Sequence, residues 1–246
     1  MFKPIHCIAL RNIRHNDKMS ILTVYTREDG RLALALPASG GKSASRLRAL
    51  TMPLSVFECL IDERPGKEIY NFKNVLPELS ECANMKFMHE KNCISFFLAD
   101  FFNAVLREQM PDPKIFDFVK NISYEIQAAD SRNKLANIHI QALRGTTVLL
   151  GIEPDLTGSD KGNVRFNMSE GRWTTCEEGS SKAFLTQEAS DILKRIFVNP
   201  SIGENACLLN RNERNLVVDT VLSYLSFQGY PVENLTSLSI VRECMI

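Results

Sequence analysis

The hydrophobic period of this chain changes once, near Pro77, and that change limits what the chain can fold into. Before it, apolar residues alternate in short runs, as they do in half-buried strands. Residues 31–36 are the clearest case, because their leucines all fall on one face. After it, apolar residues recur every three or four positions, which is the helical period. The pattern therefore predicts an α+β protein with its strands first.

Five strand-like runs precede the change, at residues 5–14, 19–26, 31–36, 52–61 and 68–75. Asp29-Gly30 supplies the positive φ of a two-residue hairpin turn. Arg64-Pro65-Gly66 has the residue order of a type II turn. Five short strands so closely spaced predict a five-stranded OB-fold barrel. We therefore expect an OB-fold domain at residues 1–78 and an α-helical domain at residues 79–246.

Capping signals place the helices of the second part. Helices are predicted over about residues 92–109, from the Asp112-Pro113 cap onward, and over 133–150, 186–197 and 210–229. The first is apolar on so wide a face that it should be central and buried. Asn210 and Glu213 have the spacing of a capping box. Residues 153–181 are polar and aperiodic, which indicates a loop or small subdomain, with Trp173 packing it down.

A formal net charge of +0 hides an asymmetry between the two ends of the chain. Residues 1–50 hold nine basic and three acidic side chains, which leaves about +6 there and about −6 elsewhere. Such an end suits an anionic partner, although a solvated surface is the alternative. A glycine- and serine-rich loop at residues 40–48 and the strand ends supply the candidate DNA-binding side chains, which are Lys42, Arg46, Arg48, Arg14, Arg27 and Arg31. Tyr25, Tyr70 and Phe72 either stack on bases or belong to the core.

No group of side chains suggests covalent chemistry, so we expect no enzyme. The segment ending in Gly41-Lys42-Ser43 resembles a P-loop, but Leu36 stands where that motif needs its first glycine. The four histidines are isolated, and Asp100 should face outward or form an ion pair. The seven cysteines form no C-x-x-C pair, which argues against a zinc site or a disulfide framework. No apolar run reaches the length of a membrane span, so we expect a cytoplasmic protein without membrane contact.

Several segments together resemble the bacterial RecO family of recombination mediators. The matching N-terminal segments are Val24-Tyr25-Thr26-Arg27-Glu28-Asp29-Gly30-Arg31-Leu32 and Arg46-Leu47-Arg48-Ala49-Leu50-Thr51-Met52-Pro53-Leu54. In the helical part they are Ala142-Leu143-Arg144, Leu150-Gly151-Ile152-Glu153-Pro154-Asp155-Leu156 and Tyr224-Leu225-Ser226-Phe227-Gln228-Gly229-Tyr230-Pro231. Their order and spacing extend the resemblance over nearly the whole chain.

The resemblance implies binding of single- and double-stranded DNA and annealing of complementary strands. It also implies two protein partners, RecR and the acidic C-terminal tail of single-stranded DNA-binding protein (SSB), and help in loading RecA. Lys42, Arg46 and Arg48 occupy the matching DNA-binding loop, and Lys134 and Arg144 are candidates for the partner site. The alternative is an OB-fold adaptor that binds proteins but not DNA, and a nucleotide hydrolase is the third reading.

The chain departs from the resemblance at one place. Many members carry a four-cysteine zinc module where this chain has the polar loop at residues 153–181. The first cysteine pair would fall near Ser159 and Gly162, and of the second only Cys176 is present. Structural zinc needs four ligands, so we expect no metal and no other cofactor.

Overall fold

The structure is a computed structural model that describes residues 2–38, 41–63, 66, 68–78, 88–107, 110–175, 182–199 and 209–244. By its internal contacts the chain divides into two compact units, Met1–Asp130 with Leu235–Val241, and Ser131–Asn234 with Arg242–Ile246. The domain boundary expected at residue 78 stays a prediction. None of the helices in the described part is both long enough and apolar enough to cross a bilayer.

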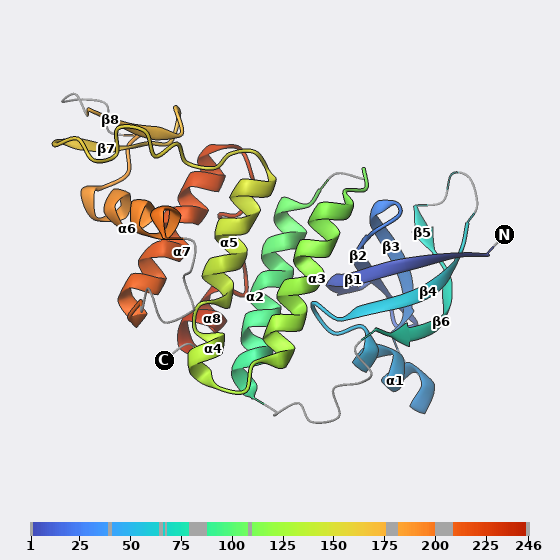
Figure 1. Ribbon diagram of the computed structural model, residues 1–246. Coiled ribbons are helices and arrows are strands. Elements are labelled where there is room, and N and C mark those ends of the chain that lie inside the picture. Colours follow the sequence, from blue (N-terminus) through green and yellow to red (C-terminus); the bar gives the residue numbers. More distant parts are fainter. Residues whose placement is uncertain are drawn as a thin grey trace. The chain divides into compact units, whose positions relative to one another are not determined.

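The first unit is built on a six-stranded sheet with the order β5-β3-β2-β1-β4-β6. Its strands are β1 (Phe2–Arg14), β2 (Met19–Thr26), β3 (Gly30–Pro37), β4 (Val56–Asp62), β5 (Ile69–Tyr70) and β6 (Phe72–Pro77). Only Asn71 separates β5 from β6, yet these strands form opposite edges of the sheet. One continuous segment therefore pairs with both edges and curls the sheet into a barrel (Figure 1).

This architecture confirms the α+β prediction with an N-terminal OB-fold. The fifth predicted strand, residues 68–75, is two short strands, because its first half pairs with β3 and its second with β4. The turn before β3 also differs from the prediction. Thr26 pairs directly with Gly30, so three residues make the turn, and Gly30 has a φ of 66°. Arg64 and Pro65 of the predicted type II turn lie outside the described residues.

Alternating side chains of the strands fill the barrel. These inward side chains are each at most 1% exposed and include Ile5, Cys7, Leu22, Val24, Leu34, Leu36, Phe57, Cys59 and Ile61. On the outer face, Ile8 and Leu10 are also buried because α2 (His89–Val105) and α3 (Pro113–Ala128) pack against β1. The barrel thus has an apolar core inside, and its outer face makes a second apolar contact with α2 and α3.

The predicted basic loop is wrong from Lys42 onward, because that segment forms a helix, α1 (Lys42–Leu50). Lysine, alanine, arginine and leucine all favour helix, and Ala44 is buried while Leu47 packs on the barrel core. The helix ends at Thr51, whose hydroxyl donates to the Leu47 carbonyl at 2.9 Å. The basic side chains therefore stand on a helix with a fixed apolar face.

Specific hydrogen bonds attach α3 to the rest of the first unit. The Ser123 hydroxyl donates to the Leu54 carbonyl at 2.7 Å, and the Asp112 backbone N–H donates to the Tyr25 hydroxyl at 3.2 Å. The Asp112 side chain also caps α3, as predicted, by accepting from the Lys114 backbone N–H at 2.8 Å.

Asp100, for which the sequence left an outward position or an ion pair open, has neutral hydrogen-bond partners. Its carboxylate accepts from the Ser237 hydroxyl at 2.9 Å and from the Ser237 backbone N–H at 3.2 Å. Ser237 precedes α8 (Leu238–Cys244), a short helix that the sequence pattern did not predict. Neutral donors at the start of a helix thus satisfy this carboxylate.

The second unit contains α4 (Arg132–Leu135), α5 (Ile138–Leu149), β7 (Val164–Asn167), β8 (Arg172–Thr175), α6 (Gln187–Val198) and α7 (Arg211–Phe227). The single helix predicted over 133–150 is two helices, interrupted at 136–137, where Asn137 has a weak helix propensity. Thr186 caps α6, and Asn210 and Glu213 form the predicted capping box of α7.

The polar segment at 153–181 contains a β-hairpin, β7–β8, rather than only a loop. Trp173 is 4% exposed, which confirms that it packs this segment down. The Phe166 ring meets Trp173 edge-on at 4.8 Å and Tyr224 of α7 at 5.0 Å, between ring centroids. The Tyr224 hydroxyl also donates to the Ile152 carbonyl at 3.0 Å. Three aromatic rings therefore hold the hairpin on the helices of its unit.

We expect Phe166→Ala to destabilise the second unit by about 3 to 5 kcal/mol, because it removes the ring between the other two. The measurement is urea unfolding followed by tryptophan emission, since Trp173 is the only tryptophan. Phe227→Ala is the matched control, because Phe227 is 44% exposed on α7. Equal unfolding midpoints for the two variants would contradict this account.

Candidate nucleic-acid interface

Two exposed cations lie one turn apart on α1. Lys42 and Arg46 are exposed, and neither makes a hydrogen bond or ion pair with any residue that the structure describes. Four residues apart on a helix, they fall on the same face. Arg48 points elsewhere and is half-buried, with its guanidinium donating to the Ala38 carbonyl at 3.0 Å and to the Ser45 hydroxyl at 3.1 Å.

A groove of about 260 Å³ separates α1 from β6, and we call it the α1–β6 groove. Its lining residues are Arg46, Leu47, Leu50, Phe72, Lys73, Asn74 and Val75. Lys73 lies opposite Leu60 in the β4–β6 register, and its ammonium sits 3.4 Å from the centroid of the Phe2 ring. The groove combines two cations with apolar and aromatic surface, and none of its described lining residues is acidic.

The three arginines predicted at strand ends are engaged inside the first unit. Arg14 forms an exposed ion pair with Asp17 at 2.7 Å. Arg27 pairs with Asp117 of α3. Arg31 donates to the Asn103 carbonyl at 2.8 Å and to the Leu106 carbonyl at 3.0 Å, at the end of α2. Arg27 and Arg31 therefore attach the helices to the barrel, and their predicted DNA contacts stay predictions.

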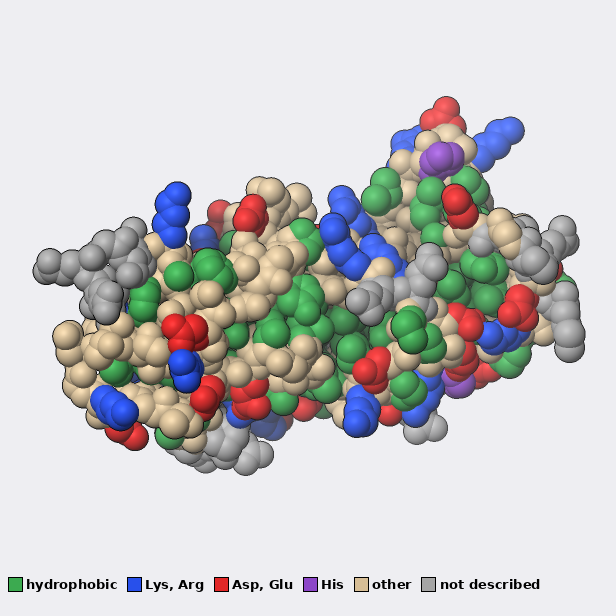
Figure 2. Space-filling view, turned by 90° about the horizontal axis from the view of Figure 1, so that it is seen from above, with side chains coloured by type: hydrophobic (Ala, Val, Ile, Leu, Met, Phe, Trp, Pro, Cys, Tyr) green, Lys and Arg blue, Asp and Glu red, His purple; other side chains and the backbone are tan. Residues whose placement is uncertain are grey.

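Arg31 also belongs to a group of like charges. Burial lowers its pKa first, and the positive charges of Arg107 and Arg11 lower it further. Arg11 and Arg107 are exposed. In Figure 2 several basic side chains lie side by side at one place, whereas acidic side chains are scattered over the view. Arg31, Arg107 and Tyr70 line a second hollow of about 750 Å³, but Asp29 and Glu68 line it too, so its charge is mixed.

The aromatic candidates for base stacking separate by burial. Tyr25 is 2% exposed and accepts a hydrogen bond from Asp112, so it belongs to the core of the first unit. Tyr70 and Phe72 are only half-buried, and each lines a hollow that also contains arginine. Phe72 has the more cationic surroundings, because both Arg46 and Lys73 share its groove.

The two partner-site candidates stand on different helices of the second unit. Lys134 is exposed on α4. Arg144 is half-buried on α5, with its guanidinium carbon 5.4 Å from the centroid of the Phe197 ring of α6. A role in partner binding stays a prediction for both residues.

The described residues at the position where the resemblance puts a zinc module do not fit a metal. The Ser159 carbonyl accepts from the Lys194 ammonium at 2.9 Å, and Asp160 pairs with the same ammonium at 2.6 Å. Neither Ser159 nor Gly162 offers a thiolate to a metal ion. The Lys194 ammonium, which is itself a cation, already binds Ser159 and Asp160. Cys176 lies outside the described residues.

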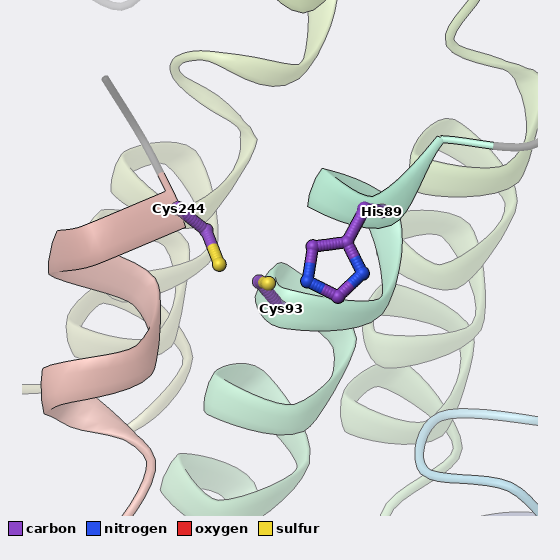
Figure 3. Close-up of side chains that lie close together, drawn as sticks. All are labelled: His89, Cys93 and Cys244. Carbon is purple, nitrogen blue, oxygen red and sulfur yellow. The ribbon is translucent and has the colours of Figure 1, made fainter.

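Among the described residues, metal-ligand types also lie close together on α2. His89 and Cys93 lie one turn apart on α2, and Figure 3 draws them with Cys244, the last residue of α8. A histidine and a cysteine four residues apart can supply two of the four ligands of a structural zinc site, but Cys93 is not one of the free thiols. The pair alone does not define such a site, and the expected lack of zinc stays a prediction.

The comparisons with known proteins agree with this architecture. The family model described as "Recombination protein O N terminal" matches residues 1–78. A DNA repair protein RecO from Porphyromonas gingivalis is 28% identical over 232 residues, which cover 91% of each chain. Proteins of the same name from Bacteroides fragilis and Flavobacterium psychrophilum are 23% and 22% identical, each with 96% of both chains covered.

An OB-fold barrel with a basic groove is a fold that many nucleic-acid-binding proteins use. The family model therefore identifies residues 1–78 as a recombination protein O N-terminal domain, and the chain is similar over at least 91% of its length to proteins named DNA repair protein RecO.

We expect the purified protein to contain no stoichiometric zinc, because the described residues at the module position offer oxygen atoms and an ammonium. Elemental analysis after dialysis measures the metal content. One zinc per chain would contradict the expectation, and its loss in Cys93→Ser would then assign it to α2.

The buried histidine of α5 should make the second unit sensitive to acid. Burial, assisted by the charge of Arg214, lowers the pKa of His139 from 6.5 to about 3. Between these values the unfolded chain takes up a proton that the folded chain does not, so stability falls as the pH drops below 6.5.

Relative to His139→Gln, the natural protein should lose about 1.4 kcal/mol of unfolding free energy per pH unit between pH 6 and pH 4. Urea unfolding of both proteins over this range measures the difference. Parallel pH profiles would show that burial does not lower the pKa of His139.

Proposed function

We propose that this protein is a DNA-binding recombination mediator that anneals complementary strands. The observation that carries the proposal is the α1–β6 groove, where Arg46 and Lys73 flank Phe72 without an acidic neighbour among the described lining residues. Lys42 extends this basic surface along α1. The relatives support a role in DNA repair and recombination at the level of their names.

The chemistry of the groove suits a single strand. Lys42, Arg46 and Lys73 can neutralise consecutive phosphates and release their counterions. The half-buried Phe72 ring and the aliphatic side chains of Leu47 and Leu50 offer apolar surface to a base or sugar. Strands with neutralised backbones repel each other less, so complementary strands can meet and pair.

The finer parts of the proposal rest on the resemblance to the family. They are the binding of double-stranded DNA, the loading of RecA on SSB-coated single strands together with RecR, and the binding of the SSB tail, with Lys134 and Arg144 as candidate contacts. These steps need no covalent chemistry from the protein.

One observation favours a second candidate, an OB-fold adaptor that binds proteins but not DNA. The guanidinium groups of Arg27 and Arg31 are bound inside the first unit. Less of the N-terminal positive charge is therefore available to bind DNA than the sequence indicates. An adaptor would bind its partners without any DNA-dependent salt effect.

For the triple variant Lys42→Ala/Arg46→Ala/Lys73→Ala, we expect weaker binding to a labelled single strand and a flatter salt dependence. Three lost phosphate contacts should reduce the slope of log affinity against log salt by about 2, at roughly 0.7 per contact. Fluorescence anisotropy across a salt series measures this slope.

The matched control is Lys114→Ala/Lys161→Ala/Lys182→Ala, which removes the same charge from exposed lysines outside the groove. An equal change in both variants would mean that net charge alone binds DNA. No binding by the natural protein at low salt would favour the adaptor.

A further inference from the structure

We propose that a second groove of the first unit, the β1–α8 groove, holds one unpaired base of a bound single strand. The inference rests on the proposed DNA binding and adds the class of DNA that this surface selects. The groove has a volume of about 500 Å³, and its principal lining residues are Arg11, Asn12, Arg48, Met52, Phe96 and Ile240.

The surface inside this groove is unusually apolar for an exposed region. Met52 is 44%, Phe96 41% and Ile240 43% exposed, and all three line the same groove. Large apolar side chains that gather at one exposed place mark binding sites more often than scattered ones do. Phe96 is notable because its neighbours on α2, Ser95 and Phe97, are buried. Its ring is open to a flat partner.

The charges at the groove favour an anion. Arg11 is exposed and makes no hydrogen bond or ion pair with the described residues. Arg48 uses two of the five donors of a guanidinium on Ala38 and Ser45, which leaves the others for a ligand. Among the described lining residues Asp100 is the only acid, and it already accepts hydrogen bonds from Thr236 and Ser237.

The groove continues the proposed DNA path across α1. The α1–β6 groove is lined by Arg46, Leu47 and Leu50 of this helix. The β1–α8 groove is lined by Arg48 of the same helix and by Thr51, which follows its last residue. A strand that lies over α1 can therefore reach both grooves. This continuity favours a nucleotide over an acidic peptide as the occupant.

The base and the phosphates of a nucleotide each have a matching group in the groove. The base can stack on the Phe96 ring, the exposed Asn12 amide can pair with its edge, and Arg11 and Arg48 can hold the adjoining phosphates. In a duplex both faces of a base are covered and its edge is paired, so only an unpaired base can enter. The groove should therefore favour single-stranded over double-stranded DNA.

The test compares Phe96→Ala, Phe96→Leu and the natural protein on a labelled oligodeoxythymidylate and on a duplex of equal length. Loss of one stacked base should weaken single-strand binding about fivefold or more, with an unchanged salt slope and unchanged duplex affinity. Phe96→Leu keeps apolar bulk but not the aromatic face, so it should be weakened as well. Phe227→Ala, an exposed phenylalanine of α7, is the control, and circular dichroism checks folding.

The outcomes separate this inference from the proposed function. If the Phe96 variants bind single strands as well as the natural protein, while the Lys42/Arg46/Lys73 variant does not, the base site is wrong and the DNA groove stands. Full binding by Phe96→Leu would replace stacking by simple packing and overturn the inference. An acidic, apolar peptide that loses its binding in Phe96→Ala, with DNA binding intact, would assign the groove to a protein partner.

Discussion

The first unit depends on residues 69–77, the segment that hydrogen-bonds to β3 with its first half and to β4 with its second. Because both sheet edges are paired by one segment, the barrel closes around its apolar core and leaves no long open edge. The same segment carries Phe72 and Lys73 to the side of α1. Barrel closure therefore creates the α1–β6 groove as well as the core.

Arginine serves two purposes in this unit, and the neighbouring groups decide which. Arg27 and Arg31 meet a carboxylate of α3 and the carbonyl end of α2, where a cation is favourable, and so they fasten helices to the barrel. Arg11 and Arg46 meet no such group in the described part and keep their charge for a ligand. The basic excess of the first 50 residues is thus partly structural and partly available for binding.

Aromatic packing holds the β-hairpin of the second unit in place. Phe166 packs edge-on against both Trp173 and Tyr224, so the hairpin gains buried area and aromatic contacts. The bond from the Phe166 backbone N–H to the Ser190 hydroxyl, 3.0 Å long, adds a link to α6. The hairpin is therefore held by contacts with side chains of its own unit.

The sequence by itself determined the fold class, most strand positions and the caps at Asp112, Thr186 and Asn210, because alternation and capping are local properties of the chain. Tertiary structure decided the rest. The helix at α1 forms because the barrel gives Leu47 a place to bury, and Asp100 finds its partners in residues more than a hundred positions away. Lys73 lines the α1–β6 groove for the same reason, because only pairing between distant segments brings β6 beside α1.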